Sequence, residues 1–451
     1  MLHSTNPYTG EKLASRQTDS DHRIEEVLRS ARLAFEHWRA TPLEKRIACV
    51  QRLGELTTEQ ASKWAFQMAL EMGKPVVQGK AEMLKCASLC RIAGTRAAEW
   101  LANEDLSSDG RKAFVQHDPI GVVLGIMPWN FPFWQVYRFA IPTLLAGNTA
   151  ILKHASNVSL CAAGAVELFK EAGFPEGVFD ALFIPGNRAT SLVADYRIAG
   201  VSLTGSEYAG SHVAAAAGKA IKPVVLELGG NNAFIVDHDA DLNHAVETFI
   251  KARFLNSGQS CIAAKRLLLH NAIYADFLAL LLDRMDELVV GDPTSPATFV
   301  GPLARVDLAD ELQSQFERSV NAGARCVKGG ERNGALFQPT VLVDVEPGMA
   351  AFDEESFGPL AAITRFDHFE SAIALSNASR FGLGVSVFSS SVDCVLAYAK
   401  AFNEGAVFIN DLVYSDPELP FGGVKVSGIG RELARDGMLA FVNRKTVVVR
   451  L

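Results

Sequence analysis

The run GVVLGIM at residues 121–127, followed at once by PWNFP at residues 128–132, gives the first indication of the fold. Seven almost uniformly apolar residues are typical of a strand that is buried on both faces of a parallel sheet. Similar short runs recur along the chain, with helical patterns between them: strands at 149–152, 179–184, 198–203 and 223–227, and helices at 132–145, 159–172, 187–195 and 206–218. This alternation predicts a doubly wound α/β domain with helices on both faces of its sheet.

The sequence on either side of this domain has different patterns. The first hundred residues are predicted to be helical, with a capped helix start at residues 19–21 and another helix at about 78–101. A second α/β unit is predicted from about residue 231 onward. The tail at residues 446–451 is predicted to be a strand that has no obvious partner of its own.

The composition is that of an ordinary globular protein, with 451 residues, 49% of them hydrophobic and 21% charged. These values exclude collagen, coiled coils and disordered chains, and the length predicts two or three domains. Because 43 Lys and Arg face 51 Asp and Glu, the net charge of −8 provides no basic surface for nucleic acid or for an anionic membrane. Gly121, Pro128 and Pro132 interrupt the uncharged stretch at 119–137, which is therefore not expected to span a membrane.

The seven cysteines are odd in number, and no C-x-x-C pair occurs among them. A chain of this length does not need disulfide bonds to fold, so free thiols in a reducing compartment are expected. The first residues, MLHSTNP, show neither the charged nor the apolar region of a signal peptide. We therefore expect a cytoplasmic protein.

Polar, small and ionisable residues follow each predicted strand of the doubly wound sheet. In order along the chain they are PWNFP at 128–132, KHAS at 153–156, PGN at 185–187, TGS at 204–206 and ELGG at 227–230. Ligands of open parallel sheets bind beyond the carboxyl ends of the strands. The sequence therefore predicts a binding site at this edge.

Three segments permit both a functional and a structural interpretation. Gly205 and Ser206 open a helix in a G-S-x-x-x-G pattern, which can hold a pyrophosphate or can simply be a strand–helix turn. Cys261 follows the small polar run NSGQS and is either an exposed nucleophile or an inert buried thiol. The run HDADLNH at 238–244 has no zinc or calcium spacing and is interpreted as a capped helix start, so no metal site is expected.

Taken together, these motifs resemble the aldehyde dehydrogenase superfamily over essentially the whole chain. The resemblance rests on seven motifs in the family's order: PWNFP at 128–132, KxxS at 153–156, GSxxxG at 205–210, LELGG at 226–230, NxGQxC at 256–261, EExFGP at 354–359 and PFGGxKxSGxGRE at 420–432. Each motif is weak alone, but seven in order make a chance match negligible. The resemblance implies an NAD(P)-dependent oxidation of an aldehyde to an acid.

The resemblance also assigns catalytic roles. Cys261 would be the nucleophile that forms a thiohemiacetal and then a thioester, and Glu227 would activate the water that hydrolyses it. The side-chain amide of Asn130 and the backbone N–H of Cys261 would form the oxyanion hole. Glu432 matches a second acidic residue near the water route.

The same resemblance assigns the cofactor site. Lys153 matches the lysine on the adenosine ribose, and Glu355 and Phe357 match the residues that hold the nicotinamide ribose and ring. The other expected cofactor contacts are Trp129, Ser156, Gly186, Gly205, Ser206, Leu228 and Gly229. NAD-preferring relatives often carry Glu where this chain has Ser156, so NADP is expected to be used at least as well as NAD. The orientation of nearby Glu207 stays open.

The family fold implies three parts. A Rossmann-like cofactor domain would comprise residues 1–103 and 120–229, and an α/β catalytic domain residues 230–425. A small β oligomerisation arm would combine residues 104–119 with 433–451, and its tail strand would pair with the sheet of another subunit. A homodimer or homotetramer is therefore expected.

The substrate is predicted from Arg138, eight residues after Asn130. Family members that oxidise succinic semialdehyde carry an arginine at this offset for the substrate carboxylate, and Ser415 is expected to add a polar contact. The runner-up is a general enzyme for glutaric semialdehyde or for aromatic and medium-chain aldehydes. A catalytically silent member and a CoA-acylating member are further alternatives, against which the retained Cys261, Glu227 and Asn130 argue.

Overall fold

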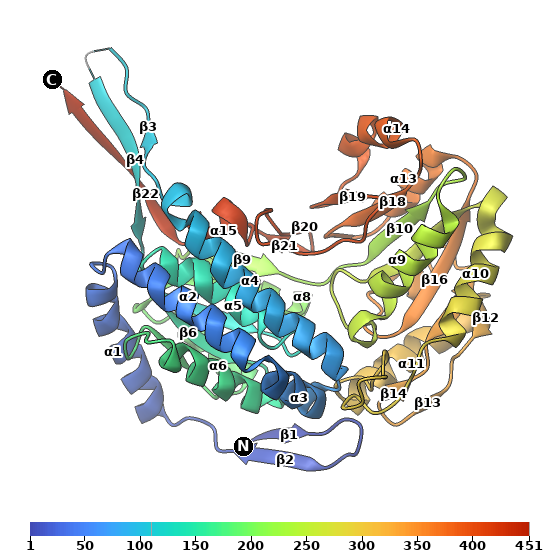
Figure 1. Cartoon of the computed structure of the whole chain (residues 1–451), viewed down its shortest axis with the longest axis horizontal. Coiled ribbons are helices and arrows are strands. Elements are labelled where there is room, and N and C mark those ends of the chain that lie inside the picture. The colour runs from blue at the N-terminus through green and yellow to red at the C-terminus, as the bar shows by residue number, and fades with distance from the viewer. Residues whose placement is uncertain (110, 451) are drawn as a thin grey trace.

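A computed structural model describes residues 1–109 and 111–450, and it contains the predicted doubly wound sheet (Figure 1). The six strands lie in the order β21-β9-β8-β5-β6-β7, and all neighbours are parallel except β21. Their bounds are β5 Val122–Met127, β6 Thr149–His154, β7 Phe179–Ala181, β8 Ile198–Thr204, β9 Val224–Glu227 and β21 Gly428–Ile429. Strand β7 is shorter than predicted: it ends at Ala181, although Leu182 N still donates to Leu152 O of β6 at 2.8 Å.

Alternate side chains of the central strand β5 enter two different cores, as expected for a strand buried on both faces. Val122 and Leu124 pack with α1, α7 and α8, whereas Val123 packs with α2 to α6. The helices are α1 Asp21–Trp38, α2 Leu43–Glu59, α3 Ala61–Met72, α4 Val76–Trp100, α5 Trp134–Leu145, α6 Ser159–Glu171, α7 Gly186–Val193 and α8 Glu207–Lys219. Helices therefore cover both faces of the sheet, which confirms the predicted fold class.

The prediction that the first hundred residues are helical is wrong for the first sixteen. Strands β1 (Leu2–Thr5) and β2 (Lys12–Arg16) form an antiparallel hairpin. Four- and five-residue strands give too little alternation to detect in a sequence. Tertiary contacts hold the hairpin in place, because the buried Ser4 hydroxyl donates to Glu71 Oε1 at 2.5 Å.

The second α/β unit is built on a seven-stranded sheet in the order β12-β15-β16-β11-β10-β18-β19. Its strands are β10 Asn232–Val236, β11 Ala264–His270, β12 Arg325–Lys328, β15 Thr340–Val343, β16 Leu360–Phe366, β18 Val385–Phe388 and β19 Val407–Ile409. Its main helices are α9 Leu242–Phe254, α10 Tyr274–Asp286, α11 Val306–Asn321 and α13 Phe369–Asn377. The shorter elements are η1 Ser156–Val158, η2 Leu255–Gly258, η3 Asn271–Ile273, β13 Arg332–Asn333, β14 Leu336–Phe337, α12 Ala350–Asp353, β17 Phe381–Gly382, α14 Val392–Ala397, η4 Ala399–Ala401, β20 Val424–Lys425 and α15 Ala434–Leu439.

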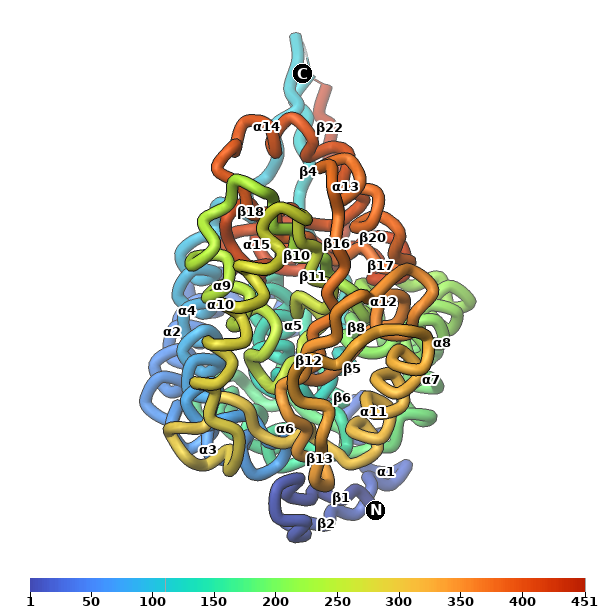
Figure 2. The backbone as a smooth tube through the Cα atoms, turned by 90° about the vertical axis from the view of Figure 1, so that its right-hand side faces the viewer, coloured from blue at the N-terminus to red at the C-terminus, as the bar shows by residue number. Residues whose placement is uncertain are grey.

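The tail strand has a partner in its own chain, which corrects the sequence prediction. Strand β22 (Val442–Arg450) pairs antiparallel with β4 (Arg111–Pro119) over nine residue pairs, and β3 (Glu104–Asp105) completes the sheet. Figures 1 and 2 show this sheet projecting away from both α/β units. The pairing was missed because it joins segments more than 300 residues apart. Within the described residues, no helix is long and apolar enough to cross a bilayer.

Candidate active site

Two cavities meet at Cys261, between the doubly wound sheet and the second α/β unit. The first cavity has a volume of about 630 Å³ and is lined mainly by residues that follow strands β5, β6, β8 and β9 and by the loop at 353–357. The second cavity, of about 400 Å³, is lined mainly by helices α4 and α5, by the end of α9 with the turn that follows it (251–263), and by the loop at 412–421. Cys261 and Gln135 line both cavities. Cys261 can therefore be reached by ligands from two sides.

The turn that presents Cys261 is conformationally unusual. Asn256, Ser257 and Gly258 in η2 all have positive φ angles, of 54°, 55° and 72°. The Asn256 side chain stabilises this turn by donating from Nδ2 to the carbonyl oxygens of Asn130 at 2.8 Å and Gln259 at 3.1 Å. Consecutive left-handed residues of this kind are costly and are concentrated at functional sites.

The Cys261 thiol is protonated in this environment at neutral pH. Burial raises the pKa of Cys261 to about 11, although the positive charges of Lys265 and Arg138 favour the thiolate. The high reactivity that the sequence suggested for this thiol therefore requires a base or an additional positive charge to form the thiolate.

Asn130 lies in the loop after β5, and its side chain points toward the Cys261 turn. Its Nδ2 donates to Gln259 O at 3.1 Å, and its Oδ1 accepts from Gln135 Nε2 at 3.0 Å. The second Nδ2 proton is available to another acceptor. The loop is held by His154 Nε2, which lies 2.9 Å from Pro132 O.

Glu227 ends strand β9 and is buried without a hydrogen-bond partner for either carboxyl oxygen among the described residues. Burial and the nearby Glu432 carboxylate raise the pKa of Glu227 well above its usual range. The side chain lies beside Gly422, where an added Cβ would be 2.7 Å from Oε1, and it lines neither cavity. The raised pKa favours the protonated carboxyl group, and in this conformation the side chain lies outside both cavities.

The first cavity contains most of the residues expected to hold a dinucleotide. The predicted residues that line it are Trp129, Lys153, Gly205, Ser206, Leu228, Gly229, Glu355 and Phe357. Ser156 and Gly186 do not line it, although Ala155, the neighbour of Ser156, does. Helix α8 begins at the cavity with Ser206 as its N-cap, so backbone N–H groups and the helix dipole favour a phosphate there.

The residues around the first cavity fit a nicotinamide cofactor. Lys153 is buried, and desolvation lowers its pKa, which an anionic ligand would reverse. Glu355 Oε1 accepts from Lys265 Nζ at 2.8 Å and from Gly230 N at 3.0 Å, so this carboxylate is positioned before any ligand binds. The ring of Phe357 packs edge-on against Trp129 at 5.7 Å.

The second cavity contains the two predicted substrate residues. Arg138 is buried, forms an ion pair with Glu432 and donates to Thr204 Oγ1 at 3.2 Å. Ser415 Oγ accepts from Trp134 Nε1 at 3.0 Å and from Lys85 Nζ at 2.9 Å. A hydroxyl that accepts two hydrogen bonds keeps its own proton free for a ligand.

Comparisons with known proteins identify the family. The sequence profile of the "Aldehyde dehydrogenase family" matches residues 1–447. The chain belongs to the aldehyde dehydrogenase family.

Several named aldehyde dehydrogenases are similar to this chain over its full length. It is 44% identical over 445 residues to a "Probable succinate-semialdehyde dehydrogenase [NADP(+)]" of Synechocystis sp., covering 98% of both chains. It is 43% identical to a "Succinate-semialdehyde dehydrogenase [NADP(+)]" of Mycobacterium avium, covering 98% of this chain and 95% of that one. The crystal structure of succinic semialdehyde dehydrogenase from Streptococcus pyogenes with NADP+ superposes with a TM-score of 0.97, at 34% identity and 100% coverage of both chains.

The aldehyde dehydrogenase site also contains side-chain contacts that the sequence did not predict, and one residue, Lys85, that it did not single out. Glu207, whose orientation the sequence left open, pairs with Arg380 at the wall of the first cavity. Lys85 and Trp134 line the second cavity beside Ser415. None of these contacts follows from a motif, because each joins side chains from distant elements. The one available signal was the position of Trp134, two residues after the PWNFP loop.

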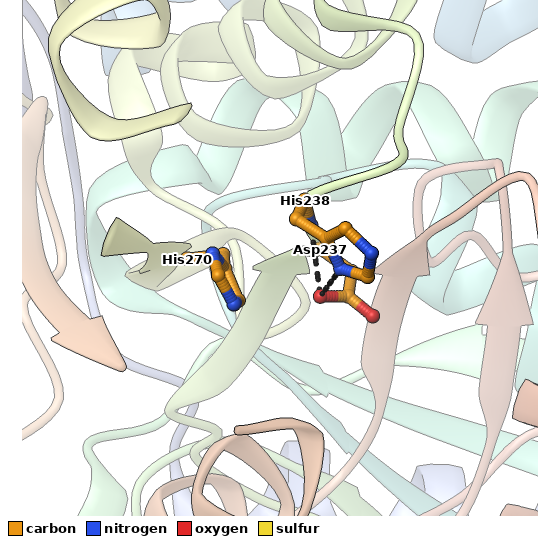
Figure 3. A group of neighbouring side chains, drawn as sticks. All are labelled: Asp237, His238 and His270. Carbon is orange, nitrogen blue, oxygen red and sulfur yellow. Dashed lines mark hydrogen bonds and ion pairs between the residues drawn. The ribbon is translucent and has the colours of Figure 1, made fainter. Parts of the chain in front are cut away.

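The histidine-rich run of this aldehyde dehydrogenase forms a helix start, as predicted. Asp241 caps α9 by accepting from His244 N at 3.1 Å. Figure 3 shows Asp237 and His238 beside His270 of strand β11. The side-chain atoms of these three residues that could bind a metal lie within 4.8 Å of one another. The His238 side chain is 61% exposed and bonds to Asp237, and none of the three lines either cavity. This group is therefore separate from the reaction site.

Proposed function

We propose that this aldehyde dehydrogenase oxidises succinic semialdehyde to succinate with NADP+ or NAD+. The observation that carries the proposal is the second cavity, which brings the Arg138 guanidinium and the Ser415 hydroxyl to the same space as Cys261. An aldehyde carbon at Cys261 and a carboxylate at the far end of a short chain match this arrangement. The names of the relatives from Synechocystis and Mycobacterium support the same substrate.

The proposed reaction begins when the Cys261 thiol loses its proton to solvent water and the thiolate sulfur attacks the aldehyde carbon, whose oxygen takes up the negative charge. The Asn130 amide and the backbone N–H of Cys261 stabilise the resulting oxyanion. When bound in the first cavity, the nicotinamide supplies the hydride acceptor that converts the thiohemiacetal to a thioester. Glu227, once ionised and turned toward Cys261, removes a proton from the water that attacks the thioester carbon, and the thiol leaves.

The movement of Glu227 follows from its surroundings. Among the described residues, no hydrogen bond to the Glu227 carboxyl group would have to break before the side chain turns. Burial and the Glu432 carboxylate raise the pKa of Glu227. Glu432 itself is paired with Arg138 and accepts from Ser202 Oγ at 3.1 Å. The charge of Arg138 therefore acts on Glu432 and Glu227, and the same residue lines the second cavity, where the substrate would bind.

The cofactor preference is proposed from Lys153 and Ser156. A buried ammonium beside a small hydroxyl accommodates a 2′-phosphate, which a glutamate at the position of Ser156 would repel. The names of the relatives from Synechocystis and Mycobacterium, which specify NADP(+), support NADP as the preferred form. Ser156 lies next to the first cavity rather than in its wall, so it would contact the cofactor at the cavity's edge.

We further propose a cytoplasmic homo-oligomer with the three parts predicted from the sequence. The projecting sheet supports the arm at 104–119 and 433–451, because β22 pairs with β4 on one edge and has no strand on the other among the described residues. A free, regular edge of nine residues is suited to pair with another subunit. Seven cysteines without a disulfide in the described chain support a reducing compartment.

A wider aldehyde range is the second candidate function. The second cavity has a volume of about 400 Å³ and several aromatic walls, among them Phe131, Trp134, Tyr414 and Phe421. This space exceeds what a four-carbon acid fills, and it favours glutaric semialdehyde or aromatic and medium-chain aldehydes.

The test compares Arg138→Ala with the wild type on succinic semialdehyde and on butanal. Loss of the carboxylate partner should cost about 2–5 kcal/mol in kcat/KM for the acid alone. Because the substitution also releases Glu432, the ratio of the two kcat/KM values is the relevant quantity. Equal losses, or a wild type that prefers butanal, would favour the general aldehyde dehydrogenase. Adding CoA should leave NADPH formation unchanged, which separates hydrolysis from thioester transfer.

A further inference from the structure

The second cavity contains a cation that no family motif assigns. Four basic side chains line it: Lys74, Lys85, Arg138 and Lys251. Lys74 is paired with the buried Glu82, Arg138 is paired with Glu432, and Lys251 is exposed. Among the described residues, Lys85 alone is a half-buried cation of this cavity without a carboxylate partner.

The contacts of Lys85 direct its ammonium group into the cavity rather than into solvent. Its Nζ donates to Ser415 Oγ at 2.9 Å and lies 4.3 Å from the centre of the Trp134 ring. Both partners line the same cavity, and both are neutral. A cation held by a hydroxyl and an aromatic face keeps its full charge available for a ligand.

The electrostatics of the site point to an anion. Burial and the neighbouring Arg138 charge lower the pKa of Lys85 to about 8. Two cations that repel each other in an apolar cavity are both stabilised by an anion placed between them. The Ser415 hydroxyl proton, which is not used by Trp134 or Lys85, provides a third donor at the same place.

We propose that Lys85 binds the carboxylate of the substrate, together with Ser415 and Arg138. This inference rests on the proposed oxidation of succinic semialdehyde and names a determinant of its specificity. Arg138 is already neutralised in part by Glu432, so Lys85 provides the uncompensated charge. Trp134 and Ser415 position the ammonium group before the substrate arrives.

The experiment measures kcat/KM for succinic semialdehyde and for butanal with four proteins: wild type, Lys85→Met, Lys85→Arg and Lys80→Met. Methionine retains the length of the side chain and removes its charge. Lys80 is exposed on the same helix and lines neither cavity, so Lys80→Met is the matched control. We expect Lys85→Met to lose roughly 10- to 100-fold on the acid and less than about threefold on butanal. Lys85→Arg should retain most of the preference for the acid.

The pH dependence gives a second readout. The ratio of the two kcat/KM values cancels the titration of Cys261, which acts on both aldehydes. In the wild type this ratio should fall above pH 8, because Lys85, whose pKa is about 8, loses its charge. The charged and titratable groups that face it are Glu82 and Cys86 of α4, Arg138 of α5 and Asp416 of the loop between β19 and β20. In Lys85→Arg the ratio should stay constant through this range.

The outcomes separate the two proposals. A wild type that prefers the acid, with an unchanged ratio in Lys85→Met, would overturn the role of Lys85 and leave the proposed function standing. A wild type without any preference for the acid would overturn both. If Lys85→Met does not fold, Lys85→Gln and the inhibition constant of succinate decide. A succinate affinity equal to that of the wild type in the folded Lys85→Gln variant would contradict the inference.

Discussion

The two cavities that meet at Cys261 are built in different ways. One wall of the first cavity consists of turns at the carboxyl ends of parallel strands, with Gly205, Ser206 and Gly229 among them, and side chains of α11 and of the loop at 353–357 complete the cavity. The second cavity is lined by long side chains on two helices and by two loops from the other α/β unit. The first is therefore determined by sheet topology, and the second by side-chain packing between distant elements.

This difference predicts how the two cavities respond to change. Strand ends are held by continuous hydrogen-bonded ladders, so a cofactor site made of them is rigid and tolerant of neighbouring substitutions. A cavity made of Lys, Arg and aromatic side chains changes its specificity with a single replacement. Variants on the two sides of Cys261 should therefore separate cofactor preference from aldehyde preference.

Replacing Cys261 itself should have the largest effect. Cys261→Ala removes the nucleophile that both cavities share, and turnover should fall by at least about 10⁴-fold. The affinity for NADP+, measured by calorimetry, should change by less than about threefold because the first cavity keeps its other walls. A parallel loss of NADP+ affinity would show that the two cavities are not independent.

Glu227→Gln should produce the next largest loss. Steady-state turnover should fall by about 10²- to 10⁴-fold, while a burst of NADPH equal to one turnover remains. Because burial and Glu432 raise the pKa of Glu227, its basic form grows as pH rises, and wild-type thioester hydrolysis should accelerate toward alkaline pH. Rapid-quench measurement of the variant should show no such rise. A variant without a burst would instead place Glu227 in the first chemical step.

Asn130→Ala should slow both classes of aldehyde equally. Loss of one oxyanion donor costs about 3–4 kcal/mol in kcat, or roughly 10²- to 10³-fold. Succinic semialdehyde and butanal should be affected alike, in contrast to Arg138→Ala, because the donor contacts the reacting oxygen only. The amide also bonds to Gln259 O, so Tm is measured as a control for folding. An effect confined to the acid would assign Asn130 to the carboxylate.

The smallest expected effect is a change in the preference between NADP+ and NAD+, without a change in aldehyde preference. Ser156→Glu should shift the preference from NADP+ toward NAD+ by about tenfold, or 1.4 kcal/mol, through repulsion of the 2′-phosphate. The ratio of activities on the acid and on butanal should not change, because Ser156 is remote from the second cavity. A wild-type kcat/KM for NAD+ ten times that for NADP+ would contradict the proposed preference.

The first cavity was largely predictable from the sequence. Eight of the ten expected cofactor residues line it, because a residue that follows a parallel strand must lie at the sheet edge. Arg138 and Ser415, which the sequence predicts as substrate contacts, both line the second cavity. The hairpin of β1 and β2, and the partner of β22, were not predicted because short or distant pairings leave no local pattern.

The sequence by itself determined the family and the position of most strands and helices along the chain, and it predicted which residues react. These follow from local periodicity and from motifs of a few consecutive residues. The tertiary structure decided which charged side chains are paired with each other and which remain available to bind a ligand. Glu432 pairs with Arg138, 294 positions away in sequence, and Lys85 reaches Ser415 across 330 positions. Such contacts depend on how separately folded layers pack together, and no local pattern records them.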